Sequence, residues 1–329
     1  MAELATEQRA AAPVIGNLLL VAVVIVLGLI VSVVGLGLLE GFGTPTGDAA
    51  FEFEQRPAGL EVRPIALGTD VVIELNGEPI EAVGADEAGK PVLVPTAPGD
   101  ELTVLSQDEQ SAVFLRERID DREQLGNFIA YYPFDGSGST VDDRSGNGND
   151  GSINGDPVRL ESGMRFDGND DINVSAITTD SDVSEFTVVA AYKQTGAQND
   201  VNQLVEHQYS GGSEWFLETS PNTGEDYSDG YSIDYAVQYP DEVVSSEAVE
   251  LNERHVVAGT YDGSEYELYV DGEFQGRGTH SEPVETGALR IARDFESNSQ
   301  YFNGEIYEIR LYYTAFDEAE IERITAVMS

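Results

Sequence analysis

The sequence predicts a mainly β protein with four parts: an N-terminal transmembrane helix, a small β-sandwich, a large antiparallel β-sandwich and a short C-terminal helix. The uncharged run from Ala10 to Leu39 exceeds the roughly 20 apolar residues that cross a bilayer. Short alternating runs separated by turn residues fill most of the remaining chain, as in sandwiches. A helical pattern closes the chain, with Asp317 as N-cap and Glu320 three residues later.

The charge composition indicates an acidic, strongly hydrated surface. The 329 residues include 61 acidic and 17 basic side chains, a formal net charge of -44, and the only lysines are Lys90 and Lys193. Molar salt screens charge repulsion to within about 3 Å, so this surface fits a salt-adapted protein; an ordinary acidic secreted protein is the alternative. The scarcity of basic residues argues against a nucleic-acid partner. The absence of cysteine excludes disulfides and thiolate sites.

The N-terminal segment combines a short polar leader ending at Arg9 with the apolar core Pro13-Val-Ile-Gly16. It resembles the N-terminus of haloarchaeal type IV pilins. That resemblance implies cleavage by a prepilin peptidase between Arg9 and Ala10, and assembly with other pilin subunits through a filament-core helix over residues 10–40. Three glycines of the helix would allow close packing between helices, or are incidental in a plain membrane anchor: Gly16, Gly28 and Gly35.

The remaining chain divides at changes of composition into a leader (1–9), the apolar helix (10–40), a linker (41–47), a small β domain (48–122) and a large β domain (127–329). Five strand-like runs follow the linker, and Asn76-Gly77 between two of them is a strong hairpin signal. These runs predict a compact β-sandwich, which the pilin resemblance would make the headpiece.

In the large domain, Asp262-Gly263 and Asp271-Gly272 bracket a run that places Tyr266, Leu268 and Val270 on one face. Three blocks, in this order, carry a family resemblance: 143–151 (DRSGNGNDG), 255–263 (HVVAGTYDG) and 302–312 (FNGEIYEIRLY). They resemble laminin-G-like domains of the concanavalin A-like jelly-roll fold. The resemblance implies a large antiparallel jelly-roll sandwich with a lectin-like, recognition role.

Two oxygen-rich loops are candidates for a structural Ca²⁺, since calcium takes six to eight oxygen ligands. The same residues also favour turns without any metal. The candidate ligands are Asp143, Asn147, Asn149, Asp167, Asn169 and Asp171.

Candidate ligand-binding residues are aromatic and lie in a Gly/Asp-rich stretch, although strand tyrosines also commonly pack inside a sandwich. They are Tyr209, Trp215, Tyr227 and Tyr231. Asn173 opens an Asn-Val-Ser glycosylation sequon.

No catalytic residue is predicted. The Glu-x-Asp-x-x-Glu signature of hydrolases with this fold occurs nowhere in the sequence, and the histidines lie far apart. The leading hypothesis is a non-enzymatic, pilin-like surface subunit that displays a lectin-like domain for adhesion or glycan binding. It would sit in the cell membrane, or in a pilus, with most of the chain extracellular. The alternatives are a monomeric, membrane-anchored laminin-G-like protein and a cell-surface carbohydrate-active enzyme.

Overall fold

The computed structural model describes residues 49–107, 112–119, 126–175, 177, 183–196, 201–209, 212–223, 226–238, 241–246, 248–281, 284, 287–295 and 300–329. The leader, apolar helix and linker predicted for residues 1–47 lie outside these ranges, as do the cleavage residues Arg9 and Ala10 and the packing residues Gly16, Gly28 and Gly35.

The predicted fold class needs a correction, because it included a transmembrane helix. Over the described ranges the only α-helix is α2 (Glu318–Met328), and none of their helices is long and apolar enough to cross a membrane. Helix α2 is an amphipathic helix of 11 residues that buries Ile321, Ile324 and Met328. The fold is therefore mainly β with one short C-terminal helix.

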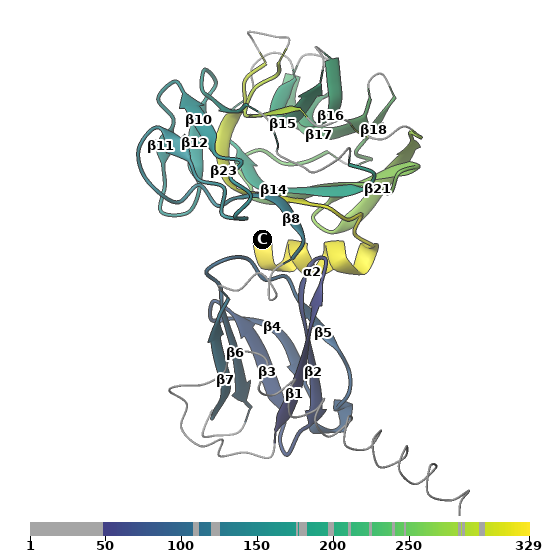
Figure 1. Cartoon of the computed structure of the whole chain (residues 1–329). Helices are drawn as coiled ribbons and strands as arrows, with labels where there is room; N and C mark the ends of the chain where they lie inside the picture. The colour runs from purple at the N-terminus through teal and green to yellow at the C-terminus, as the bar shows by residue number, and fades with distance from the viewer. Residues whose placement is uncertain are drawn as a thin grey trace, which may run out of the picture.

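Residues 49–119 form a small sandwich of two antiparallel sheets, seen at the bottom of Figure 1. One sheet has the order β1 (Ala50–Arg56), β2 (Gly59–Ala66), β5 (Val92–Val94). The other has the order β4 (Glu78–Val83), β3 (Val71–Leu75), β6 (Glu101–Ser106), β7 (Val113–Arg118), and a 3-10 turn, η1 (Ala85–Glu87), follows β4. The sequence pattern missed β4 and β7, whose runs are interrupted by proline or charged residues.

The turn predicted at Asn76-Gly77 is confirmed, but the strand that follows it is β4, which was not among the predicted runs. Asn76 and Gly77 have φ values of 56° and 84°, the left-handed conformation that a tight primed turn requires. Asn76 also donates from Nδ2 to Asp100 Oδ1 at 2.9 Å, which ties the turn to the start of β6.

Residues 126–329 form a larger sandwich of two antiparallel sheets. The outer sheet, which lies away from the small domain, has the order β18 (Glu242–Val244), β17 (Asp226–Val237), β16 (Gly212–Thr223), β15 (Asn202–Tyr209), β22 (Ala288–Ile291), β13 (Asp171–Val174), β10 (Gly151–Asn154), β9 (Thr140–Val141). The inner sheet has the order β11 (Val158–Arg159), β12 (Met164–Asp167), β23 (Asn303–Tyr312), β14 (Phe186–Gln194), β19 (His255–Tyr261), β20 (Glu265–Val270), β21 (Glu273–Thr279), and β8 (Phe128–Tyr132) pairs with β23.

The core of this sandwich lies between its two sheets and confirms the alternation predicted for β20. Tyr266 and Leu268 are buried between the sheets, and Val270 packs against the same cluster. Tyr269, at an alternate position, belongs instead to the core that joins the two domains. Strand β20 therefore has two buried faces, although a sheet that faced water would have only one.

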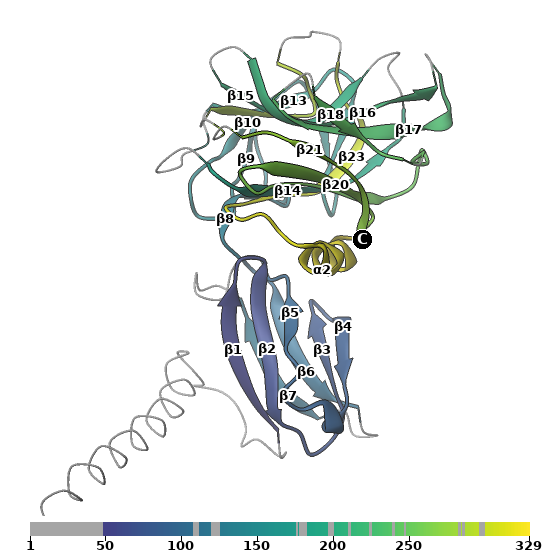
Figure 2. The same ribbon diagram turned by 90° about the vertical axis from the view of Figure 1, so that its right-hand side faces the viewer.

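Helix α2 lies between the inner sheet and the small domain (Figures 1 and 2). Its predicted cap is confirmed, since Asp317 Oδ1 accepts from Glu320 N at 2.9 Å and the Glu320 carboxylate accepts from Asp317 N at 3.1 Å. Ile321 and Ile324 share one buried cluster with the small domain and the inner sheet. Arg323 Nη2 also lies 2.7 Å from Glu81 Oε2 of β4. The far face of the inner sheet is therefore covered, whereas α2 and the small domain do not pack on the outer sheet.

Candidate functional site

The candidate site is the outer face, defined here as the side chains of the outer sheet that point away from the sandwich core. Strand register places these side chains next to one another across five strands, because directly paired residues share a face. One row runs Arg290, Glu206, Phe216, Ala236 and Glu242. The next row runs Gln203, Glu218, Asp234 and Val244.

A β-bulge in β15 makes this arrangement possible. The register of β15 against β16 shifts between Gln203 and Val205, so the buried residue Leu204 is left without a direct partner in β16. Gln203 consequently pairs with Glu218 on the outer face, while Val205 pairs with Leu217 in the core. Bulges commonly redirect side chains next to functional sites.

The outer face is polar but well covered. Gln203 and Glu206 are each 1% exposed, and Asp234 is 5% exposed. Part of the cover comes from the segment after β22, where Phe295 N donates to Glu206 Oε2 at 2.8 Å. Polar groups so shielded from water usually have protein partners.

Two oxygen acceptors of the outer face have no hydrogen-bond partner among the described residues. Within the part of the chain that the structure describes, no hydrogen-bond donor reaches Asp234 Oδ1 or Gln203 Oε1. The second oxygen of Asp234 accepts from Ser220 Oγ, which lies 3.0 Å from Ser232 Oγ. A buried polar atom without a partner costs about 1–3 kcal/mol, so these two oxygens are unsatisfied acceptors beneath the surface of the outer face.

The carboxyl groups of the outer face perturb one another. Burial, together with repulsion from Asp234, Glu242, Asp294 and Glu206, raises the pKa of Glu218 to about 9. Burial likewise raises the pKa of Asp234, against the hydrogen bonds from the two serines. Glu218 therefore holds a proton at neutral pH and can donate a hydrogen bond as well as accept one.

Positive charge collects at one end of the outer face. Arg293 Nη1 lies 3.3 Å from Asp171 Oδ1, and Arg290 Nε lies 3.8 Å from Asp171 Oδ2. The Arg290 guanidinium also stacks 4.3 Å from the centre of the Phe295 ring. Asn173 of the predicted sequon pairs with Arg290 in this region and is half-buried; its glycosylation stays a prediction.

The first predicted calcium loop is organised by hydrogen bonds. Both oxygens of Asp143 accept two of them: Oδ1 from the backbone of Tyr131 and Ser145 at 3.0 and 2.9 Å, Oδ2 from Ser145 Oγ and Asn149 N at 2.8 and 3.0 Å. Asn147 and Asn149 donate their side-chain amides to backbone carbonyls of β8. The loop thus has a structural role that needs no metal.

The second predicted calcium loop is organised by Asp170, which lies within that loop. Asp170 accepts from the backbone of Asp156 at 2.7 Å and of Asp167 at 3.3 Å, while Asp171 pairs with the arginines. Neither Asn169 nor Asp167 converges with three acidic or histidine side chains, and the described ranges contain no such metal-type group. Calcium binding at either loop stays a prediction.

Two of the four aromatic residues predicted to contact a ligand are buried in the core instead. Trp215 is 3% exposed and stacks on His207, with ring centres 5.6 Å apart, inside the core. Tyr231 is fully buried and donates from its hydroxyl to Tyr192 Oη at 3.1 Å. The side chains of Tyr209 and Tyr227 lie outside the described part of the structure.

His207 is also a core residue. Burial lowers its pKa to about 4, and its Nε2 accepts from Gly287 N at 3.0 Å. The functional residues that sequence reasoning missed are the polar positions between these core residues, namely Gln203, Glu206, Glu218 and Asp234. The alternation along β16 and β17 was the signal that could have found them.

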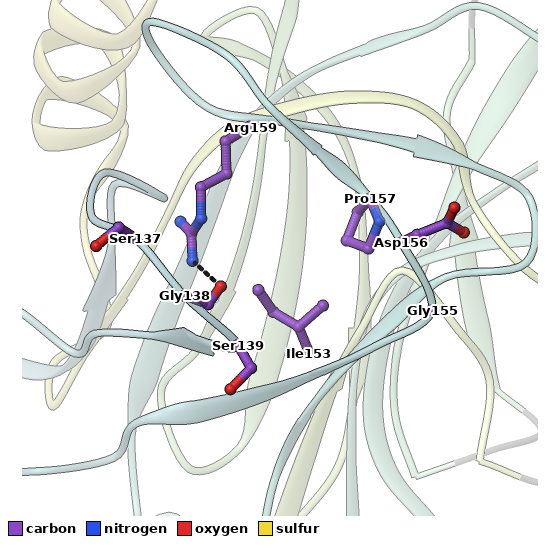
Figure 3. Close-up of a pocket in the computed structure, with 8 residues that line it drawn as sticks. All are labelled: Ser137, Gly138, Ser139, Ile153, Gly155, Asp156, Pro157 and Arg159. Atoms are coloured by element: carbon purple, nitrogen blue, oxygen red, sulfur yellow. Dashed lines mark hydrogen bonds between the residues drawn. The ribbon is translucent and has the colours of Figure 1, made fainter.

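One open pocket of about 420 Å³ lies at the edge of the sandwich, away from the outer-face carboxylates (Figure 3). Its walls include the hydroxyls of Ser137 and Ser139, the carboxylate of Asp156 and the apolar side chain of Ile153. Arg159 lines it too, but its guanidinium already donates to the carbonyls of Phe134 and Thr140, at 3.1 and 2.6 Å. The pocket therefore offers no unpartnered buried group comparable to those of the outer face.

The large domain consists of two packed antiparallel sheets, as in a jelly-roll sandwich. Residues 166–322 match the family model Laminin_G_3 of the concanavalin A-like lectin/glucanases superfamily. This match and the two packed antiparallel sheets support the concanavalin A-like jelly-roll fold that the sequence blocks predicted for the large domain. No curated protein matches the sequence.

Solved structures similar to the chain include domain 4 of an extracellular arabinanase from Geobacillus stearothermophilus in complex with arabinotriose. It is 14% identical with a TM-score of 0.49, over 60% of this chain and 98% of that one. The ligand-binding domain of botulinum neurotoxin serotype D with N-acetylneuraminic acid is 12% identical with a TM-score of 0.48, over 61% of this chain and about half (51%) of that one. A pentraxin from Limulus polyphemus is 13% identical with a TM-score of 0.41, over 53% and 80%.

Proposed function

We propose that the chain is a surface protein whose lectin-like domain binds glycans through the outer face. The observation that carries this proposal is the pair of buried, unpartnered acceptors, Asp234 Oδ1 and Gln203 Oε1, on the exposed side of a lectin-type sandwich. Sugars present many hydroxyl donors, and polar groups that are fixed in a covered site fit such donors. The opposite sheet is unavailable, because α2 and the small domain cover it.

The finer part of the proposal concerns display. A type IV pilin-like N-terminus, prepilin-peptidase cleavage before Ala10 and an extracellular location in a membrane or pilus are supported by the Pro13–Gly16 motif alone. A net charge of -44 supports a high-salt environment. The mass of the N-terminal peptide of the mature protein tests this part, because a start at Ala10 is expected and an intact Met1 would contradict it.

A glycan array tests the binding role directly. The labelled protein should be applied at about 1 M salt, where non-specific charge effects are screened to about 3 Å. We expect binding to a limited set of glycans, its loss in Gln203→Ala, and its retention in the control Gln55→Ala, which changes an exposed glutamine of β1. Equal binding by both variants would exclude the outer face, and binding to no glycan would reject the function.

One observation favours a second candidate, hydrolysis of a glycosidic bond. Glu218 and Asp234 pair directly across β16 and β17, which puts their Cβ atoms about 4.5–5.5 Å apart. Retaining glycosidases also use two neighbouring carboxyl groups, one of them protonated. Release of reducing sugar from a polysaccharide panel, abolished in Glu218→Gln, would replace the binding role with this one.

A further inference from the structure

We infer that the outer face selects glycans that carry a protonated amine, such as a non-acetylated amino sugar, and discriminates against anionic glycans. This inference rests on the proposed glycan-binding role and specifies the ligand of that same site. The groups concerned are here called the acceptor cluster, and they are Gln203, Glu206, Glu218, Asp234 and Glu242.

The acceptor cluster is rich in carboxyl groups, and three of them have no matching cation in the described part of the chain. In the described ranges, no lysine, arginine or histidine lies within ion-pair distance of Glu218, Asp234 or Glu242. The nearest arginine in the register, Arg290, points its charge toward Asp171 and Phe295 instead. Elsewhere in the molecule, shielded carboxylates do have cations, as Glu305 has Lys193 at 2.8 Å and Arg165 at 2.8 Å.

The unpartnered atoms decide which ligand chemistry fits. Asp234 Oδ1 and Gln203 Oε1 only accept hydrogen bonds, and both belong to side chains that are at most 5% exposed. A ligand must therefore bring donors. An ammonium group brings three donors and a positive charge, so it supplies what an unpartnered acceptor lacks and offsets a neighbouring carboxylate, since charge-assisted hydrogen bonds are about twice as strong as neutral ones.

Other sugars fit the acceptor cluster less well. A hydroxyl group satisfies an acceptor but leaves the negative charge of the covered carboxylates without compensation. An N-acetyl group replaces the charged nitrogen with a neutral amide that has one donor. A uronic or sialic acid adds a carboxylate to a region where like charges already repel. The order of affinity expected from this chemistry is amine first, then neutral sugar, then acidic sugar.

Binding of an amine should also displace a proton. The charged groups that face Glu218 are Glu206 on β15, Asp234 on β17, Glu242 on β18 and Asp294 after β22, all of them acidic. Together with burial they raise the pKa of Glu218 to about 9, so the free protein holds this proton at neutral pH. A neighbouring ammonium favours the ionised carboxylate, so binding releases up to about one proton, whereas a neutral sugar releases none.

Isothermal titration calorimetry of the full chain separates these cases. The probes are the β-1,4 disaccharide of glucosamine, its N,N′-diacetyl form and a galacturonic acid disaccharide, each at about 1 M salt so that the net charge is screened. Titrations in two buffers of different ionisation enthalpy give the number of protons released. Calcium chloride alone is a fourth probe, because a divalent cation would also suit a carboxyl-rich site.

The variants are Glu218→Gln, which keeps the shape and removes the proton, and Asp234→Asn. Glu54→Gln, an exposed carboxyl of β1, is the control for loss of one charge. Because Glu218 is already protonated in the free protein, Glu218→Gln should leave the fold intact. The wild-type proton count needs no variant, so it tests the inference even if Asp234→Asn unfolds.

The expected result is that the amine disaccharide binds at least about tenfold tighter than its acetylated form, with near-unit proton release. Asp234→Asn should weaken it about tenfold to a hundredfold, and Glu54→Gln should not. Tighter binding of the neutral or acidic sugar, amine binding without proton release, or calcium binding that the amine does not compete with would overturn the inference and leave the glycan-binding role standing. Binding of no sugar at all would overturn both.

Discussion

Replacing Arg310 with methionine should weaken the joint between the two domains. Arg310 lies on β23 and is 3% exposed, with its side chain directed at the small domain. Its Nε donates to Glu308 Oε2 at 3.0 Å, and its Nη1 donates to the Pro95 carbonyl of the small domain at 3.3 Å. The guanidinium also lies 5.3 Å from the centre of the Tyr131 ring. Methionine keeps the apolar stem and loses the charge and both donors.

The size of the effect follows from what the substitution leaves behind. Glu308 is 14% exposed, so without Arg310 it becomes a shielded carboxylate with no cation. Removing one partner of a buried ion pair costs about 3–5 kcal/mol, and the low end applies because Glu308 keeps some water contact. We therefore expect the free energy of unfolding to fall by about 3 kcal/mol, which corresponds to a melting temperature lower by roughly 6–12 °C. The double variant Arg310→Met/Glu308→Gln should recover at least half of this loss.

Urea unfolding measured by two probes is the assay. Trp215 is the only tryptophan and reports the lectin-like core, while circular dichroism in the far ultraviolet reports both domains. The two transitions should coincide in the wild type, because one buried cluster spans both domains, and should separate in Arg310→Met. A variant within about 1 kcal/mol of the wild type, or a double variant no more stable than the single one, would refute the reasoning.

Two further predictions concern carboxylates of the lectin-like domain. Burial opposes ionisation of Glu305, but hydrogen bonds from Lys193 and Arg165 lower its pKa to about 2. The ionised Glu305 carboxylate therefore stabilises the fold by at most about 2 kcal/mol above pH about 4.5, and this contribution disappears as the pH falls toward 2. Glu305→Gln should flatten the acid limb of a curve of unfolding free energy against pH. An unchanged acid limb would contradict this prediction. Asp143→Ala should lower the free energy of unfolding by about 3 kcal/mol, because three backbone donors lose their acceptor. Calorimetry should give the same loss of stability with calcium and with a chelator. A loss only with calcium would instead indicate that Asp143 binds a metal ion.

Local patterns predicted the parts of the fold that are encoded within a few residues. The Asn76-Gly77 turn requires two left-handed residues, and the cap of α2 needs only Asp317 and Glu320, so neither depends on distant contacts. The alternation of β20 was also sufficient to predict Tyr266 and Leu268, the residues that face the sandwich core. Strands β4 and β7 were missed because their pairing with β3 and β6 outweighs weak local preference, as is general for strands.

The candidate site was harder to predict because its residues are distant in the sequence. Gln203, Glu218 and Asp234 come together through strand register, and that register depends on the bulge in β15. In a sequence with 61 acidic residues, polar positions between aromatic ones resemble an ordinary solvated face. The sequence pattern pointed to aromatic residues as the ligand-binding side chains. Trp215 and Tyr231 fill the core instead, because a sandwich of this size needs bulky side chains between its sheets.

The position of α2 explains why the outer face can be functional while the inner sheet is structural. Tyr269 of β20 and Val256 of β19 point away from the sandwich core and would be exposed apolar groups if the lectin-like domain stood alone. They are buried because α2 and the small domain pack on them, and Arg310 and Arg323 add polar contacts across the same joint. A ligand site on that sheet would compete with the contacts that hold the domains together. Asp234 Oδ1 and Gln203 Oε1 of the outer sheet take no part in this joint, and the glycan-binding role proposed above would offset the cost of leaving them unpartnered.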